Sequence, residues 1–136
     1  DVNVWANKVL LDELLVACPS VDQVVGISSG ASKNGSGGWG AYAISKAALN
    51  LLLRVAADER PATHFTALAP GIVDTPMVQS VLAQPRCDRH PANGRVAAAV
   101  DEGRFFTPEA AAARVMEVLP ILRSRPSGGF ADVREI

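Results

Sequence analysis

Helical and strand-like segments alternate along this chain of 136 residues, and that order limits the folds open to it. Apolar residues recur at helical spacing over 2–17, and they cover most of the circumference of a second helix over 41–59. A hydroxyl N-cap, a proline and a carboxylate at 107–109 predict the start of a third helix, which runs to about residue 119. Three short runs bounded by turn residues predict strands, at 24–27, 63–68 and 128–133. Alternation of this kind predicts an α/β fold with parallel strands and right-handed crossovers.

Two further segments predict irregular structure. Four glycines among polar residues indicate a loop over 32–40. The segment 73–106 holds three prolines and shows no sustained periodicity, which favours a long connection with short helical pieces. Because long connections of this kind often form lids or binding loops, we interpret 73–106 as a substrate-loop region within a single domain.

Charge and composition argue against several classes of partner. The 13 basic and 14 acidic residues are scattered, so neither a nucleic acid nor an acidic membrane surface is expected to bind. No apolar run is long enough to span a bilayer, and no secretory signal opens the chain. Cys18 and Cys87 lack metal-ligand spacing, which predicts unpaired thiols and no metal site. We therefore expect a cytoplasmic protein.

Three side chains suggest proton-transfer chemistry. Tyr42 and Lys46 lie four positions apart at the start of a predicted helix, which places them on one face. Ser29 follows the strand 24–27, at the sheet edge where open α/β sheets bind ligands. A phenol exchanges protons poorly near neutral pH, but a cation held close to it favours the phenolate. This set of groups predicts proton exchange with the oxygen of a carbonyl or an alcohol, with the serine holding that oxygen.

These residues lie in stretches that resemble the short-chain dehydrogenase/reductases. The stretches are 25–30 with Ser29, 39–48 with Tyr42 and Lys46, and 69–75 with its Pro-Gly turn, in the order of the family. The thirteen positions between Ser29 and Tyr42 are the usual separation in that family. The residues of these motifs are most similar to those of the sepiapterin reductase and benzil reductase branch.

The resemblance implies roles for named residues. Four would be catalytic: Tyr42 as acid/base, Lys46 as the cation that makes it acidic, Ser29 as donor to the carbonyl oxygen, and Asn3 as a relay that positions the lysine through a water. Tyr42 and Lys46 would also bind the cofactor. The remaining cofactor-binding residues would be Pro70, Gly71 and Ile72 along the nicotinamide, and Thr75 near its carboxamide or the diphosphate.

Several of these residues, and others near them, also have a structural interpretation. A tyrosine near a helix start commonly packs with its hydroxyl in water, and Asn3 on its own could cap a helix. Thr75 stands before a proline, which is ordinary turn chemistry. Trp39 could pack the glycine-rich loop, contact the substrate, or do both. Two histidines are expected to be structural or solvated, His64 and His90.

The chain departs from the family pattern at its beginning. A complete member opens with a strand, a glycine-rich turn and a helix that holds the cofactor diphosphate, and none of these is present. The resemblance therefore implies the C-terminal half of a Rossmann-like, doubly wound parallel sheet. The strand 24–27 would then be paired on one side only. NADP(H) is the first expectation for the cofactor, ahead of NAD(H), but the residues that choose between them would follow a missing strand.

Two functions remain open at this point. The first is an NAD(P)-dependent oxidoreductase that acts on a small carbonyl or alcohol substrate, homodimeric or oligomeric when full length, of which this chain alone would be inactive. The second is a non-catalytic interaction module with a partial reductase fold. The helix 41–59, apolar around most of its circumference, suits either one, because in the family it pairs with its copy.

Overall fold

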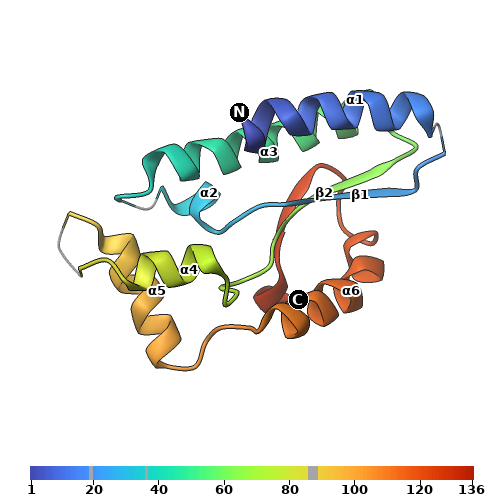
Figure 1. Cartoon of the computed structure of the whole chain (residues 1–136). Helices are drawn as coiled ribbons and strands as arrows, with labels where there is room; N and C mark the ends of the chain where they lie inside the picture. Colours follow the sequence, from blue (N-terminus) through green and yellow to red (C-terminus); the bar gives the residue numbers. More distant parts are fainter. Residues whose placement is uncertain (19, 36, 86–88) are drawn as a thin grey trace.

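Three parallel strands form one sheet in the computed structural model, which describes residues 1–18, 20–35, 37–85 and 89–136. The strands are β1 (Gln23–Ile27), β2 (His64–Ala69) and β3 (Gly129–Asp132), in the order β1-β2-β3 (Figure 1). Ile27 pairs with Leu68, and Ala69 pairs with Asp132, so the carboxyl ends of the strands lie at one edge. The predicted α/β fold, part of a Rossmann-like sheet, is confirmed.

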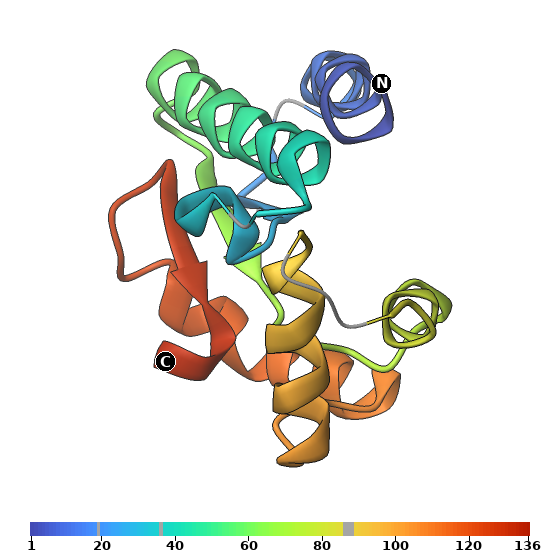
Figure 2. The ribbon, with the colours of Figure 1, turned by 90° about the vertical axis from the view of Figure 1, so that its left-hand side faces the viewer.

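Helices cover both faces of this sheet (Figures 1 and 2). The helix α1 (Asn7–Ala17), preceded by the π-helical turn η1 (Val2–Ala6), and the long helix α3 (Gly40–Glu59) lie on one face. The helix α6 (Pro108–Leu122) covers the other, and the 3-10 turn η2 (Val133–Glu135) follows β3. Three further helices lie toward the carboxyl ends of the strands: α2 (Ala31–Asn34), α4 (Pro76–Leu82) and α5 (Pro91–Asp101).

The central strand β2 is buried on both faces, which explains its continuous apolar sequence. Phe65 lies in a core cluster with Leu11 of α1 and Leu53 of α3. Leu68 lies in a second cluster with Val118 and other residues of α6. The two clusters fix the sheet between its helices, so the loops at its carboxyl edge project from a rigid base.

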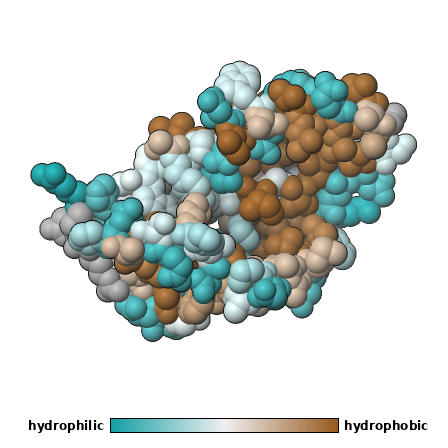
Figure 3. Space-filling view, viewed as in Figure 1, coloured by the Kyte–Doolittle hydropathy of each residue, from teal (hydrophilic) through white to brown (hydrophobic). Residues whose placement is uncertain are grey.

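The strand β1 forms the edge of the sheet in the described part of the chain. It pairs with β2 alone, as predicted, and Ile27 at its end is 48% exposed. Apolar atoms gather over α1 and β1 on the face shown in Figure 3. An exposed parallel strand and an apolar surface are features that proteins usually cover.

The glycine-rich segment contains a helical turn that the prediction of a loop over 32–40 missed. Two hydrogen bonds organise it: Ala31 N–H donates to Ser29 Oγ at 3.2 Å, and Ser32 Oγ donates to the Ser29 carbonyl at 2.6 Å. The turn ends at Gly35, whose φ of 54° is left-handed. Serine side chains next to a strand end thus start α2 locally.

The segment 73–106 contains the short helical pieces that were predicted, α4 and α5. The second is a regular helix of 11 residues, and its buried face consists mainly of alanines and one asparagine, which hides the apolar periodicity. The ends of the segment are tied together, because Phe106 N–H donates to the Ile72 carbonyl at 2.8 Å and Asp74 N–H donates to the Phe106 carbonyl at 2.9 Å. The segment therefore leaves the edge of the sheet and returns to it, and its two ends are hydrogen-bonded to each other.

The helix α6 extends past its predicted end at residue 119. It begins as expected after Thr107, whose Oγ1 accepts from Ala110 N–H at 3.2 Å. It then continues through Pro120 to Leu122, which packs in the core at its end. Because Pro120 and Met116 are both exposed, water can reach the Met116 carbonyl that the proline leaves without a helical donor. Among the described residues, no helix combines the length and the hydropathy that crossing a membrane requires.

The glycine at 128 allows β3 to approach α3 closely. Gly128 has a φ of 76°, and a Cβ there would lie 3.2 Å from Arg54 Cα and 3.1 Å from Ala57 Cβ. We expect Gly128→Ala to lower the free energy of unfolding by about 1–3 kcal/mol, measured by urea denaturation. Gly94→Ala is the matched control, because Gly94 is helical with no atom near its Cβ position, and we expect that variant to be stabilised by about 0.5–1 kcal/mol. Equal effects at the two positions would contradict this explanation.

Candidate active site

A cleft of about 540 Å³ lies at the carboxyl edge of the sheet. It is formed where η1, the turn after β1, the first turns of α3 and the turn after β2 meet. All the site residues predicted from the sequence line it: Asn3, Ser29, Tyr42, Lys46, Pro70, Gly71, Ile72 and Thr75. Residues as far apart in the sequence as Asn3 and Thr75 therefore share one space.

Tyr42 and Lys46 lie one turn apart on α3, and both side chains reach the cleft. Lys46 Nζ donates to the Ile27 carbonyl at 2.9 Å, which anchors the ammonium at the end of β1. Burial lowers the pKa of Lys46 by removing water from the ammonium. Tyr42 is half-buried, and no described residue forms a hydrogen bond with its hydroxyl. The hydroxyl is thus available to a ligand.

Ser29 is positioned by a group of polar side chains at the end of β1. Its Oγ accepts from Ala31 N–H, so its own hydrogen is free to be donated. Next to it, Ser28 Oγ donates to Asn50 Oδ1 at 2.5 Å, and Asn50 Nδ2 donates to Ser32 Oγ at 2.8 Å. Sequence analysis missed Asn50, which lies one turn beyond Lys46 on α3, and this spacing was the available signal.

Asn3 is tied to the beginning of α3. Its Nδ2 donates to Ser45 Oγ at 3.0 Å, and Ser45 Oγ donates to the Tyr42 carbonyl at 2.8 Å. The alternative in which Asn3 caps a helix is wrong, because Asp1 precedes η1 and Asn3 lies inside it. The structure shows no direct hydrogen bond between Asn3 and Lys46, so the relay through a water stays a prediction.

The turn after β2 forms the wall of the cleft opposite α3. Gly71 has a φ of 82°, and a Cβ there would lie 3.1 Å from the ring of Phe106, so the turn packs closely on this aromatic side chain. Thr75 begins α4 and its Oγ1 accepts from Val78 N–H at 3.4 Å. Thr75 thus has a structural role as a helix cap, where turn chemistry was expected, and it also lines the cleft.

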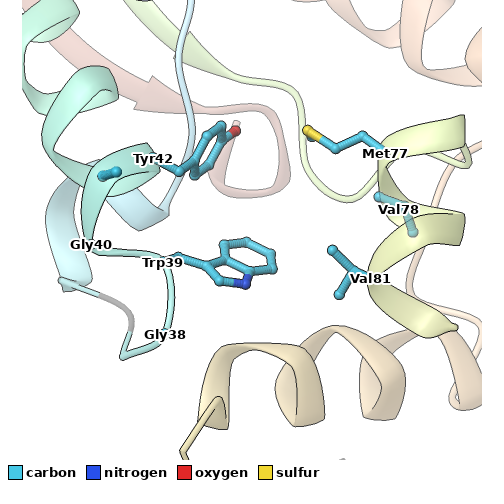
Figure 4. Close-up of a pocket in the computed structure, with 8 residues that line it drawn as sticks. Gly38, Trp39, Gly40, Tyr42, Met77, Val78 and Val81 are labelled. Atoms are coloured by element: carbon cyan, nitrogen blue, oxygen red, sulfur yellow. The ribbon is translucent and has the colours of Figure 1, made fainter. Parts of the chain in front are cut away.

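An apolar pocket of about 290 Å³ adjoins the cleft at Tyr42 (Figure 4). Trp39 and Tyr42 face Met77, Val78 and Val81 of α4 across it. The two aromatic rings meet edge to face, with centroids 5.8 Å apart. Met77 and Val78 line both the pocket and the cleft, so the two spaces are continuous around the tyrosine.

The indole of Trp39 is fixed by a residue that sequence analysis missed. Trp39 Nε1 donates to Asn93 Oδ1 at 2.8 Å, and Asn93 Nδ2 donates to Gln84 Oε1 at 2.9 Å. Asn93 is 4% exposed on α5. A single asparagine among alanines gave no signal of this role, because its partner lies 54 positions away.

Other reactive side chains lie outside the cleft. His64 contacts the Arg125 carbonyl at 3.0 Å through Nε2, and the exposed His90 precedes α5. Cys18 is exposed and unpaired. Cys87, the other thiol considered above, is outside the described residues.

The end of β3 brings an ion pair to the same edge of the sheet. Asp132 is 4% exposed, and its Oδ1 accepts from Arg134 Nε at 2.8 Å and from Arg134 N–H at 3.0 Å. Burial alone would raise the pKa of the Asp132 carboxyl, but the hydrogen bonds and the charge of Arg134 outweigh it and lower the pKa below its usual range. The same pairing raises the pKa of Arg134.

This ion pair makes stability depend on pH. Because the pKa of Asp132 is lower in the folded than in the unfolded protein, its contribution is present above the usual carboxyl range and is lost as pH falls through the folded-state pKa. We expect Asp132→Asn to be less stable than the original protein at neutral pH, and the difference to shrink in acid. Thermal unfolding between neutral pH and pH about 2 measures both. A difference that grows in acid would contradict the assignment.

The sequence is also similar to those of known proteins. The family model described as short chain dehydrogenase matches residues 4–86. A benzil reductase ((S)-benzoin forming) of Bacillus cereus is 35% identical over 101 residues, which cover 71% of this chain and 40% of that protein. The sepiapterin reductase of Bos taurus is 34% identical over 82 residues, 57% of this chain and 31% of that protein.

Solved structures show the same arrangement of elements. The KRED1-Pglu enzyme superposes with a TM-score of 0.66 at 30% identity, over 80% of this chain and 46% of its own. The angucycline C-6 ketoreductase LanV has a TM-score of 0.71 over 96% of this chain and 49% of its own, and at 20% identity it shows the fold alone. The chain thus spans less than half the length of each relative and structure named here.

Proposed function

The chain belongs to the short-chain dehydrogenase family, and on that premise we propose that it carries the catalytic centre of an NAD(P)-dependent oxidoreductase that interconverts a carbonyl and an alcohol. The observation that supports this proposal is the meeting of Ser29, Tyr42 and Lys46 in one cleft. Two donors and an ammonium around a common space are the groups that a carbonyl oxygen needs when it gains a proton.

The residues of the cleft fit the nicotinamide end of a dinucleotide. The Lys46 ammonium and the Tyr42 hydroxyl suit the hydroxyls of a ribose, and the apolar side chains of Pro70 and Ile72 suit one face of a flat ring. Bound there, the reduced nicotinamide supplies a hydride to the carbonyl carbon. No glycine-rich phosphate-binding turn is present in this sequence, so the residues present fit this end of the cofactor only.

In the proposed reaction the side chains of the protein donate and accept the proton. The Tyr42 hydroxyl donates its proton to the carbonyl oxygen as the carbon is reduced, and takes it back in the reverse direction. The Lys46 ammonium, anchored at the end of β1, stabilises the phenolate that forms. Ser29 donates its free hydrogen to the same oxygen, where negative charge develops. Asn3 positions Lys46 through a water and holds the first turn of α3 through Ser45.

The side chains of the substrate-loop region favour an apolar substrate. The helix α4 within 73–106 places Met77, Val78 and Val81 across the pocket from Trp39. Aromatic and aliphatic walls beside the tyrosine suit an aryl or bulky alkyl group next to the carbonyl. Three of the matched relatives are named benzil reductases, which makes benzil, an aryl diketone, the first substrate to try.

The experiment uses the protein produced from its whole coding sequence. We expect it to oxidise NADPH, and NADH more slowly, when benzil is added, as followed by the absorbance of the reduced nicotinamide. The control is the same assay without ketone. A protein that binds neither cofactor in a calorimetric titration would contradict the proposal.

We further propose a homodimer formed through the exposed apolar faces of α1 and α3. Several large apolar side chains on these helices are at least 43% exposed: Val9, Leu10, Val16, Ile44, Leu51 and Val55. Burial of such a surface is a common basis for stable association. Gel filtration of the full-length protein is expected to give a dimer. The non-catalytic module considered above predicts a dimer too, but without cofactor binding or turnover, so the reductase assay separates the two functions.

A further inference from the structure

A further cavity, of about 360 Å³, adjoins the cleft at Ser29. Three arginines line it, Arg95, Arg104 and Arg134, and we call it the arginine cavity. Ser29, Gly71 and Ile72 line both this cavity and the cleft. Trp39 lines the arginine cavity, the cleft and the apolar pocket. The cleft that holds the tyrosine is therefore next to both an apolar space and a basic one.

The guanidinium of Arg134 lies beside the turn that carries Ser29. A Cβ at Gly30 would be 3.8 Å from Arg134 Nη2, and a Cβ at Gly71 would be 3.6 Å from Arg134 Cδ. Asp132 holds this group through Nε and Nη2, at 2.8 and 2.5 Å. Because those bonds leave the N–H groups of Nη1 unused, the fixed cation keeps donors for a ligand.

The charges around the cavity favour an anion. No acidic side chain is among the described residues that line it. Arg104 pairs with Glu102 and Arg134 pairs with Asp132, whereas Arg95 forms no ion pair with any described residue. Both paired arginines have donors left over, and Arg95 has all of its own, so a ligand would meet one uncompensated positive charge and several free N–H groups.

We propose that the arginine cavity binds a carboxylate of the carbonyl substrate, so that the substrate is an oxo acid with an apolar group. The apolar group occupies the pocket between Trp39 and α4, the carbonyl lies at Ser29 and Tyr42, and the carboxylate contacts Arg95 and Arg134. Guanidinium groups recognise carboxylates by paired hydrogen bonds, which gives orientation as well as affinity. This inference rests on the proposed function, because it names the class of substrate for the same centre.

The test compares an acid with its neutral ester in the full-length protein. The probes are phenylglyoxylate and methyl phenylglyoxylate, which share the ketone and the ring. We measure kcat/KM for both, and also the affinity of both by calorimetry in the Tyr42→Phe background, where turnover is suppressed. The variant is Arg95→Gln, which removes the unpaired charge and leaves the Asp132–Arg134 pair in place. The matched control is Arg60→Gln at the far end of α3, about 30 Å along the helix from Trp39.

We expect the original protein to prefer the acid, and Arg95→Gln to lower the acid-to-ester ratio about 10-fold in both measurements, as loss of a charge-assisted hydrogen bond does. Arg60→Gln should leave the ratio as it was. A ratio equal in the original protein and in Arg95→Gln would overturn the inference. Acid binding that depends on Arg95 without turnover of either ketone would support the anion site and contradict the proposed reductase, so the two failures are distinguishable.

Discussion

Replacement of Tyr42 by phenylalanine is expected to lower kcat/KM for ketone reduction by about 10²–10⁴-fold. The phenylalanine ring keeps the edge-to-face contact with Trp39 and the wall of the apolar pocket, but it has no proton to donate. The steady-state rate of nicotinamide oxidation in the full-length protein measures the loss. The affinity for the cofactor should fall far less than the rate, because the Lys46 ammonium and the Pro70–Ile72 turn remain after the Tyr42 hydroxyl is lost.

A control on the other side of the pocket separates lost chemistry from lost packing. Met77 faces Tyr42 from α4, and Met77→Leu alters the shape of the pocket without touching a proton donor. We expect that variant to change KM and to keep kcat within a few-fold. If Tyr42→Phe retained most of the rate, or if Met77→Leu lost as much of it, the acid/base role of Tyr42 would have to be abandoned.

The second large effect is expected for Ser29→Ala, about 10²–10³-fold in kcat. The alanine removes the hydrogen that Ser29 can donate to the substrate oxygen where charge develops, so the loss should appear in kcat more than in KM. It also removes the acceptor of Ala31 N–H, which costs about 1 kcal/mol of stability, so unfolding by urea is measured alongside. Ser29→Thr keeps the hydroxyl and should keep most of the rate; an equal loss in both variants would instead implicate the geometry of the turn.

The central features of the site could be predicted because they depend on short-range rules. Tyr42 and Lys46 share a helix face through a spacing of four, and Ser29 lies where the strand β1 ends. Parallel strands place their carboxyl ends at one edge, which brings the Pro70–Gly71 turn to the same place. The fold class followed from the same alternation of helices and strands.

The features that could not be predicted depend on contacts between distant segments. Asn93 holds the indole of Trp39 although the two residues are 54 positions apart in the sequence, and no local sequence pattern predicts such a hydrogen bond. The bounds of helix α5 were hidden because Val96 is the single large apolar residue on a buried face made mainly of alanines. The arginine cavity required the three-dimensional position of Arg134, which a carboxylate two residues away in the sequence holds at the sheet edge.

The most direct test of the central claim, that this cleft is a carbonyl-reducing centre, follows an isotope. Full-length protein is incubated with benzil, or with phenylglyoxylate, and a reduced nicotinamide cofactor deuterated at the transferable position, and the alcohol is examined by NMR. We predict one deuterium on the carbinol carbon, with transfer slowed about 10²–10⁴-fold in Tyr42→Phe. An alcohol without deuterium, or both ketones left unchanged by protein that has bound the cofactor, would contradict the account.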